Sequence, residues 1–303
     1  MFYRLRSKYK KARFYRLTAE ILETPPMPVV DAPWSIISMV SKSDVQMYLL
    51  SLKSFYTYIG RGKIVAIIDR DLPQESRDLL IRHFPGIRFV NLEDIDTGIC
   101  QRGGTWERVL HLVDHSRDEY AIQIDCDTLA FGHDIDEVLN CVANNIPFTL
   151  GSGGNPIETM SEAAVRARRS EGNFVGLAAE RLFDQYPNAE RLKYVRGSSG
   201  FAGFAKNGIS REMVEDFHRN MEKLLGSRWT EWGTEQCASN FAIANSPNAV
   251  VMQRPKYGNF SPGINRAMAS FLHFYGTHRY EDDFFAKRGQ DVIASLKRGG
   301  KRT

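Results

Sequence analysis

The sequence has no long hydrophobic run. No stretch reaches the roughly 18 uninterrupted apolar residues that a membrane-spanning helix requires. The basic N-terminus also lacks the apolar segment of a secretory signal. We therefore expect a cytoplasmic globular protein.

The chain is poor in cysteine, with four in 303 residues. Cys100, Cys126, Cys141 and Cys237 are far apart and form no Cys-x-x-Cys pair. This spacing indicates neither a zinc knuckle nor a disulfide framework, and it fits a reducing compartment.

Acidic residues are missing from residues 1–17, which hold seven Lys and Arg. Residues 297–303 add four bases, and without these eleven the rest of the chain has 29 bases against 36 acids. This mildly acidic body offers no continuous basic groove for nucleic acid. Two interpretations of the N-terminus stay open: a short helix on an anionic membrane surface, or a solvated, partly frayed end.

Apolar residues make up 43% of the chain, which is ample for a buried core. Strand-like and helix-like patterns alternate through the first half, which predicts an α/β fold with a mostly parallel sheet flanked by helices. The expected strands are 35–40, 63–68, 87–90, 120–124 and 148–150, and the expected helices are 45–59, 74–84, 106–115 and 134–143. Residues 152–195 show no clear strand and resemble an inserted helical or loop region.

The most informative motif closes the expected strand 120–124. Asp125 and Asp127 are two positions apart, and side chains at i and i+2 of a strand share a face. Two carboxylates on one face can hold Mn²⁺ or Mg²⁺, which keeps open positions for the phosphates of a substrate. In a parallel sheet, ligands bind beyond the carboxyl ends of the strands, so we expect a ligand near Ser41, Asp44 and Asp69.

Three features of the second half accompany this motif. Residues 197–204 form a glycine-rich extended run in which Gly200 and Gly203 could admit a ligand or simply pack in a bulged strand. Thr234 is the expected N-cap of a helix, with Glu235 and Gln236 in its first turn, where Glu235 is either a proton acceptor or a structural acid. His273 is a candidate third metal ligand, and Arg279 could pair with a phosphate.

The order of these elements resembles a known family. Arg108, then Asp125-Cys126-Asp127, a glycine-rich strand, Trp-Gly-Thr-Glu-Gln and His273-Phe-Tyr-Gly276 resembles the nucleotide-sugar glycosyltransferases of GT-A fold, most of all the glycogenin and lipopolysaccharide galactosyltransferase group. The resemblance implies a Mn²⁺ or Mg²⁺ site at Asp125, Asp127 and His273. It further implies donor contacts from Arg108 and Arg279, with the nucleoside over the ends of the first strands near Ser41 and Asp69. The other residues that we expect to contact substrate are Gly200, Gly203, Gln236 and Gly276.

The resemblance also implies a domain plan and an activity. A basic segment (1–33) precedes a GT-A domain (34–285), which divides into a nucleotide-binding half (34–150), an insertion (151–195) and an acceptor and metal half (196–285), with a basic tail at 286–303. The expected reaction moves a sugar from a nucleoside diphosphate, UDP being favoured, to a glycan or lipid-linked acceptor in cell-surface glycan synthesis. As catalytic residues we expect Asp127 and Glu235; Glu235 acts as the base if the reaction inverts, or binds hydroxyls if it retains the anomeric configuration.

Two other interpretations stay open. Haloacid-dehalogenase phosphatases also carry Asp-x-Asp after a strand, but with Thr or Val where this chain has Leu129. A catalytically inactive sugar-nucleotide-binding protein would keep the motif without turnover.

Overall fold

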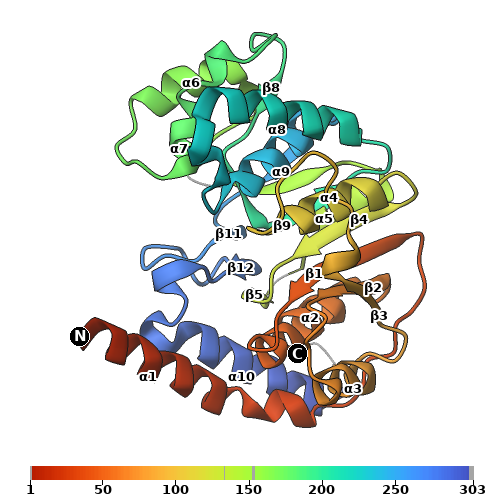
Figure 1. The fold of residues 1–303 in the computed structure, drawn as a ribbon. Coiled ribbons are helices and arrows are strands. Elements are labelled where there is room, and N and C mark those ends of the chain that lie inside the picture. Colours follow the sequence, from red (N-terminus) through yellow and green to blue (C-terminus); the bar gives the residue numbers. More distant parts are fainter. Residues whose placement is uncertain (1, 133, 152–153, 300–303) are drawn as a thin grey trace. The chain divides into compact units, whose positions relative to one another are not determined.

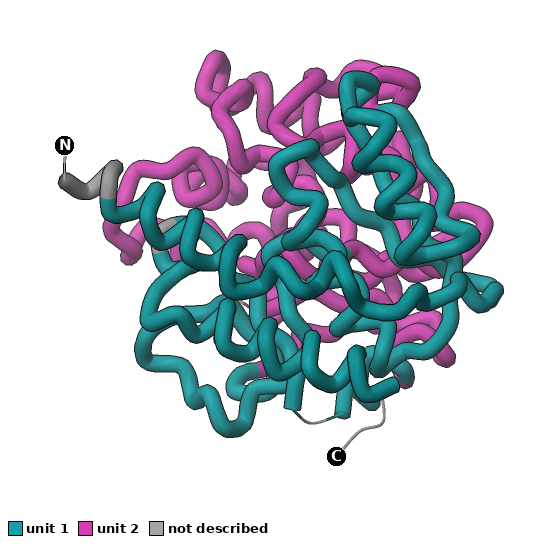
Figure 2. Tube along the Cα trace, turned by 90° about the horizontal axis from the view of Figure 1, so that it is seen from below, with its two compact units in different colours: residues 1–91, 124–139, 254–303 teal, residues 92–123, 140–253 magenta. Residues whose placement is uncertain are grey.

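The computed structural model describes residues 2–132, 134–151 and 154–299. The chain folds into two compact units that are each assembled from separate segments (Figure 2). Unit 1 comprises residues 1–91, 124–139 and 254–303, and unit 2 comprises residues 92–123 and 140–253.

A β-α-β-α-β run forms the larger part of the first segment of unit 1. Strands β1 (Trp34–Val40), β2 (Lys63–Ile68) and β3 (Arg88–Asn91) are parallel neighbours in that order, joined through helices α2 (Val45–Ile59) and α3 (Gln74–His83). β1 and β2 are almost wholly buried, as continuous apolar runs should be when both faces are covered. Val40 pairs with Ile68, so the chain leaves both strands at the same edge.

A small second sheet in unit 1 was not predicted. Its strands, in spatial order, are β11 (Tyr257–Asn259), β12 (Phe271–His273) and β5 (Thr128–Ala130). β11 and β12 are parallel, whereas β12 and β5 are antiparallel. The registers set His273 opposite both Asn259 and Thr128, so three distant parts of the sequence meet here.

The two ends of the chain form helices in unit 1. Helix α1 (Phe2–Leu17) lies beside α10 (Phe284–Lys297) (Figure 1). Phe14 is buried, and its ring packs 4.6 Å from that of Phe285. Short 3₁₀ turns complete the unit, namely η1 (Ala19–Glu23), η5 (Gly276–His278) and η6 (Glu281–Asp283).

Unit 2 has a mixed sheet in the order β10, β6, β9, β4, with bounds Val250–Met252, Phe148–Gly151, Gly197–Phe204 and Tyr120–Ile124. β10 and β6 are parallel, whereas β6 and β9 are antiparallel. The helices are α4 (Trp106–His115), α6 (Met160–Arg168), α7 (Val175–Glu180), α8 (Arg211–Leu225) and α9 (Thr234–Ala244), with turns η2 (Leu92–Asp94), η3 (Phe183–Gln185) and η4 (Gly226–Thr230). Helix α5 (Asp136–Ala143) runs from a unit 1 segment into a unit 2 segment.

These elements confirm the predicted α/β class with mostly parallel strands flanked by helices. The expectation of no strand in residues 152–195 was wrong: a short antiparallel pair, β7 (Glu158–Thr159) and β8 (Lys193–Tyr194), frames α6 and α7. A strand of two residues is too short to show the alternation of apolar and polar residues by which strands are predicted from sequence.

In the part of the chain that the structure describes, no helix is both long enough and apolar enough to cross a bilayer.

Candidate metal centre and substrate site

The acidic pair lies in unit 1, in the short loop that follows β4 and precedes β5. Helix α2 holds this loop, because the Ser51 hydroxyl donates to the Asp125 carbonyl over 3.0 Å and bonds the Thr128 hydroxyl over 2.6 Å. The Cys126 thiol contacts the carbonyl of Met39 at 3.3 Å, next to the end of β1. These contacts hold Asp125, Cys126 and Thr128, and with them the backbone that carries the two carboxylates.

His273 reaches the acidic pair through the sheet register. β12 sets it opposite Thr128, and the Phe274 amide donates to the Asp127 carbonyl over 2.7 Å. Its Nε2 lies 3.2 Å from Asp127 Oδ1 and 3.9 Å from Asp125 Oδ2. The three residues can each offer one ligand atom, and these atoms all lie within 4.8 Å of one another.

Asn259 orients the imidazole, and the sequence analysis missed it. Its side-chain oxygen lies 3.0 Å from His273 Nδ1. An amide oxygen can only accept, so Nδ1 carries the proton and Nε2 is the nitrogen that faces the carboxylates. Partners of this kind fix the tautomer of a metal-binding histidine.

Opposite charges shape the protonation of this group. Burial alone would lower the pKa of His273, but the charges of Asp127 and Asp125 outweigh it and raise that pKa. Burial would raise the pKa of Asp127, yet His273 and Arg279 lower it, so the carboxylate stays ionised. Two carboxylates with one imidazole form a donor set that suits Mn²⁺. The residues present therefore fit a divalent metal.

Arg279 was predicted to contact the diphosphate, and the structure brings it to the acidic pair. Its guanidinium bonds the Asp127 carboxylate, and its Nε donates to the Phe274 carbonyl over 2.9 Å. Gly276 begins η5 with φ near +58°, a conformation that favours glycine, so the backbone alone explains this residue.

The predicted nucleoside residues lie at one sheet edge. Ser41 directly follows β1 and Asp69 directly follows β2, whose last residues are paired. The Ser41 hydroxyl donates to Asp44 over 2.6 Å, which fixes the loop into α2. The positions agree with the topological expectation, and ligand contact stays a prediction.

In unit 2, Arg108 and Glu235 form a buried charged group. Burial raises the pKa of Glu235, while the charge of Arg108 opposes the rise. No donor among the described residues reaches Glu235 Oε2. Gln236, the next residue along α9, accepts from the Ser199 amide over 3.3 Å.

We had expected Thr234 to be the N-cap of α9, and this prediction was wrong. The N-cap is Gly233 with φ near +103°, and α9 begins at Thr234. The Thr234 hydroxyl accepts instead from the Trp106 indole over 3.0 Å and from the Gln101 amide over 3.1 Å. This tie joins the start of α9 to α4, the helix that carries Arg108.

Gly200 and Gly203, the two glycines of β9 that were predicted to contact substrate, are buried in the sheet. A Cβ on Gly203 would collide with the Phe148 ring and the Tyr120 hydroxyl, so core packing alone requires this glycine. The Gly200 amide lies 3.4 Å from the Ser198 hydroxyl. Substrate contact by either glycine stays a prediction.

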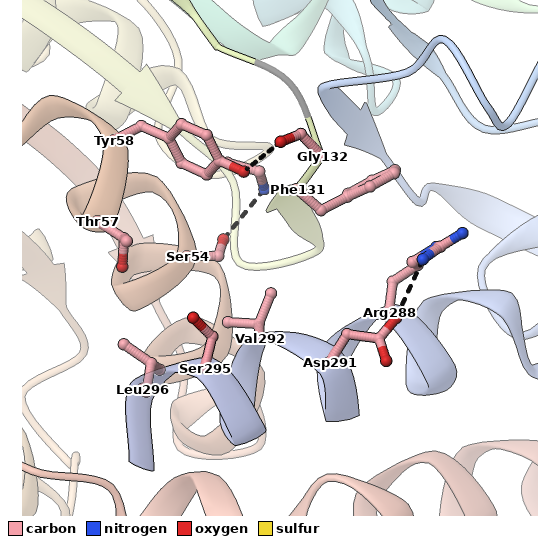
Figure 3. Close-up of a pocket in the computed structure, with 11 residues that line it drawn as sticks. Ser54, Thr57, Tyr58, Phe131, Gly132, Arg288, Asp291, Val292, Ser295 and Leu296 are labelled. Atoms are coloured by element: carbon pink, nitrogen blue, oxygen red, sulfur yellow. Dashed lines mark hydrogen bonds and ion pairs between the residues drawn. The ribbon is translucent and has the colours of Figure 1, made fainter. Parts of the chain in front are cut away.

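A separate cavity of about 290 Å³ opens between α2, the end of β5 and α10 in unit 1 (Figure 3). The Tyr58 hydroxyl donates to the Gly132 carbonyl over 3.3 Å at its rim, and Arg288 pairs with Asp291 over 3.1 Å. None of the predicted site residues lines it, so we do not assign the chemistry to this cavity.

The sequence matches no protein-family model and shows no significant similarity to a curated protein. Solved structures do match. The bifunctional glycosyltransferase WbbM superposes with a TM-score of 0.53 at 15% identity, over 90% of this chain and 52% of WbbM. An active-site mutant of LgtC superposes with a TM-score of 0.53 at 12% identity, over 86% of this chain and 95% of LgtC. The glycosyltransferase GlyE of Streptococcus pneumoniae superposes with a TM-score of 0.50 at 9% identity, over 90% of this chain and 65% of GlyE.

This chain has the GT-A fold. It spans about half the length of WbbM, the first of these relatives. At such low identities the GT-A likeness establishes the architecture and leaves the reaction to be argued from the site.

Proposed function

We propose that this GT-A protein is a metal-dependent glycosyltransferase that moves a sugar from a nucleoside-diphosphate sugar to a hydroxyl acceptor. The convergence of Asp125, Asp127 and His273 on one point of the GT-A fold carries the proposal. These residues would hold Mn²⁺ or Mg²⁺, which when bound supplies positive charge against the departing diphosphate.

The chain's own residues divide the remaining work. Arg279 has five donors in a planar fork, so it can keep its bond to Asp127 and still face a phosphate oxygen. Ser41 and Asp69 would line the nucleoside, with UDP as the favoured nucleotide. In unit 2, Arg108 and Gln236 would contact the sugar, alongside the backbone at Gly200 and Gly203.

For Glu235 we propose a hydroxyl-binding role. Its raised pKa and its Oε2, which no described donor reaches, suit a hydrogen bond with a sugar hydroxyl. This assignment goes with retention of the anomeric configuration. An inverted product, identified by proton NMR before mutarotation, would instead make Glu235 the general base.

The proposal is tested by Asp127→Ala, with Asp134→Ala as the control because Asp134 is an exposed carboxylate of the same segment. Losing a group that stabilises the transition state costs a factor of about 10² to 10³ in turnover. We expect Asp127→Ala to lose sugar transfer and donor hydrolysis in Mn²⁺ while it melts cooperatively. The Asp134 variant should keep wild-type turnover.

A thermal-shift screen with uridine, guanosine and cytidine diphosphates, with and without Mn²⁺, identifies the donor through stabilisation on binding. Unchanged turnover in Asp127→Ala would refute the mechanism. Nucleotide binding without any turnover would favour the inactive sugar-nucleotide binder. The GT-A fold leaves the phosphatase interpretation without support.

We further propose a cytoplasmic enzyme of cell-surface glycan synthesis that uses a glycan or lipid-linked acceptor. Exposed bases on α1, among them Arg6, Lys8 and Lys11, would attract an anionic membrane surface electrostatically. Phe14 packs inside unit 1 and cannot anchor the helix in lipid at the same time. Salt-sensitive sedimentation with phosphatidylglycerol vesicles, but not with phosphatidylcholine vesicles, tests this attraction.

A further inference from the structure

The N-terminal helix α1 contacts the loop that the proposed function assigns to the nucleoside. The Tyr15 hydroxyl donates to the Ser43 carbonyl over 2.8 Å. Ser43 lies between Ser41 and Asp44, and both serine hydroxyls bond the Asp44 carboxylate, over 2.6 and 3.2 Å. The loop is thus held internally by Asp44 and externally by Tyr15.

A second contact locks the end of α1 onto the start of α2. Gln46, in the first turn of α2, donates its side-chain amide to the Tyr15 carbonyl over 2.7 Å and lies 2.9 Å from the Thr18 hydroxyl. The backbone of Tyr15 is therefore held beside the start of α2, from where its side chain reaches Ser43.

The same turn of α1 also packs on the segment that carries Arg279. The Phe14 ring lies 5.4 Å from that of Tyr280, the next residue after Arg279. Arg13 pairs with Asp283 over 2.8 Å. One helical turn, residues 13–15, thus contacts both the nucleoside loop and the segment whose arginine bonds Asp127.

The surroundings of Tyr15 keep its hydroxyl protonated. Burial raises its pKa, and the neighbouring charges of Tyr280 and Asp44 raise it further, whereas Arg279 lowers it. A protonated phenol is required for the bond that it donates to Ser43.

We propose that Tyr15 is a positioning residue of the donor site, which fixes the loop Ser41–Asp44 in the conformation that receives the nucleoside of the donor. The inference rests on the proposed function. Tyr15 acts through the loop, so it affects the nucleoside and leaves the diphosphate contacts of Arg279 and the metal group intact.

The test is the affinity of the full-length protein for a nucleoside diphosphate in Mn²⁺, measured by calorimetry with the tightest of the uridine, guanosine and cytidine compounds. Losing one hydrogen bond that holds the loop should weaken binding roughly three- to tenfold in Tyr15→Phe. Tyr9→Phe is the matched control, because Tyr9 is on the same helix and 64% exposed. Gln46→Met should act in the same direction as Tyr15→Phe.

Three readouts separate positioning from general loosening of the fold. In Tyr15→Phe the affinity for inorganic diphosphate with Mn²⁺ should stay at the wild-type value, the donor KM should rise, and kcat should be unchanged. Wild-type nucleotide affinity in Tyr15→Phe would overturn the inference, as would an equal loss for inorganic diphosphate. If the wild-type protein binds inorganic diphosphate and Mn²⁺ but none of the three nucleotides, the proposed function fails and this inference fails with it.

Discussion

The side-chain amide of Asn259 determines which nitrogen of His273 faces Asp125 and Asp127. It accepts from Nδ1 at the far side of the ring, as outer partners of metal-binding histidines usually do. The bond also fixes the plane of the imidazole, which limits where a cation could be held.

Removing this amide should weaken metal binding. Losing such an outer partner typically costs 10- to 100-fold in affinity, so we expect Asn259→Ala to raise the Mn²⁺ dissociation constant by about that factor. Calorimetric Mn²⁺ titration of the nucleotide-free protein measures it. Asn259→Asp keeps an acceptor and should retain most of the affinity, and Asn265→Ala, at an exposed site in unit 1, should retain all of it. Wild-type affinity in Asn259→Ala would show that the imidazole needs no such partner.

At this scale the sequence predicted the residues whose chemistry is distinctive. Asp125, Asp127 and His273 form a recognisable motif, and the structure brings them together. Asn259, Ser51 and Tyr15 are common residue types in ordinary surroundings, and their roles depend on contacts between distant segments. No local pattern distinguishes them from other residues of the same type.

Strand β9 can pack against β6 only because residue 203 has no side chain. A Cβ there would overlap the Phe148 ring, and such overpacking costs about 1 to 3 kcal/mol. We therefore expect Gly203→Ala to lower the free energy of unfolding by that amount, measured by urea titration. Gly263→Ala is the control, because a Cβ there meets open space, and it should change stability little. A stable Gly203→Ala would mean that β6 shifts at low cost.

Long elements were predictable and very short ones were not. Helix α2 and strand β2 have the predicted bounds, since a fifteen-residue segment with apolar residues at helical spacing and five consecutive apolar residues after Lys63 are strong signals. Strands β5, β11 and β12 have three residues each, too few to show a period. They are nevertheless the strands that bring His273 to the acidic pair.

Two histidines of the fold, His83 and His111, have lowered pKa values. Burial, with the charges of Lys53 and Arg82, lowers the pKa of His83 to about 4. Burial and the neighbouring His115 likewise lower the pKa of His111 to about 4. A histidine in the unfolded chain has a pKa near 6.5. Between pH 4 and pH 6.5 the unfolded chain therefore binds more protons than the folded chain.

Stability should therefore fall as the pH drops from 6.5 towards 4. For His83 alone the linkage gives a loss of about 2 kcal/mol between pH 6.5 and pH 5. We expect His83→Leu to have a flatter dependence by about this amount, measured from urea midpoints at the two pH values. Parallel curves for His83→Leu and the wild type would exclude His83 as a source of acid sensitivity.

The alternation of strands and helices predicted the fold class, but it could not predict how the chain divides into units. Unit 1 takes residues from the beginning, the middle and the end of the chain, and such a division arises from contacts between residues far apart in the sequence. The domain plan from the sequence, with parts at residues 34–150, 151–195 and 196–285, divides the chain by its motifs and not by contacts. It stays a prediction about which part of the chain has which function.

The pairing of β5 with β12 has a consequence for synthesis on the ribosome. The acidic pair is translated almost 150 residues before its histidine, and the antiparallel ladder that joins them cannot close until both have left the exit tunnel. During most of its elongation, a nascent chain therefore cannot coordinate a metal ion with all three residues, Asp125, Asp127 and His273. Cation affinity would appear late and abruptly, which makes it a natural reporter of completed folding.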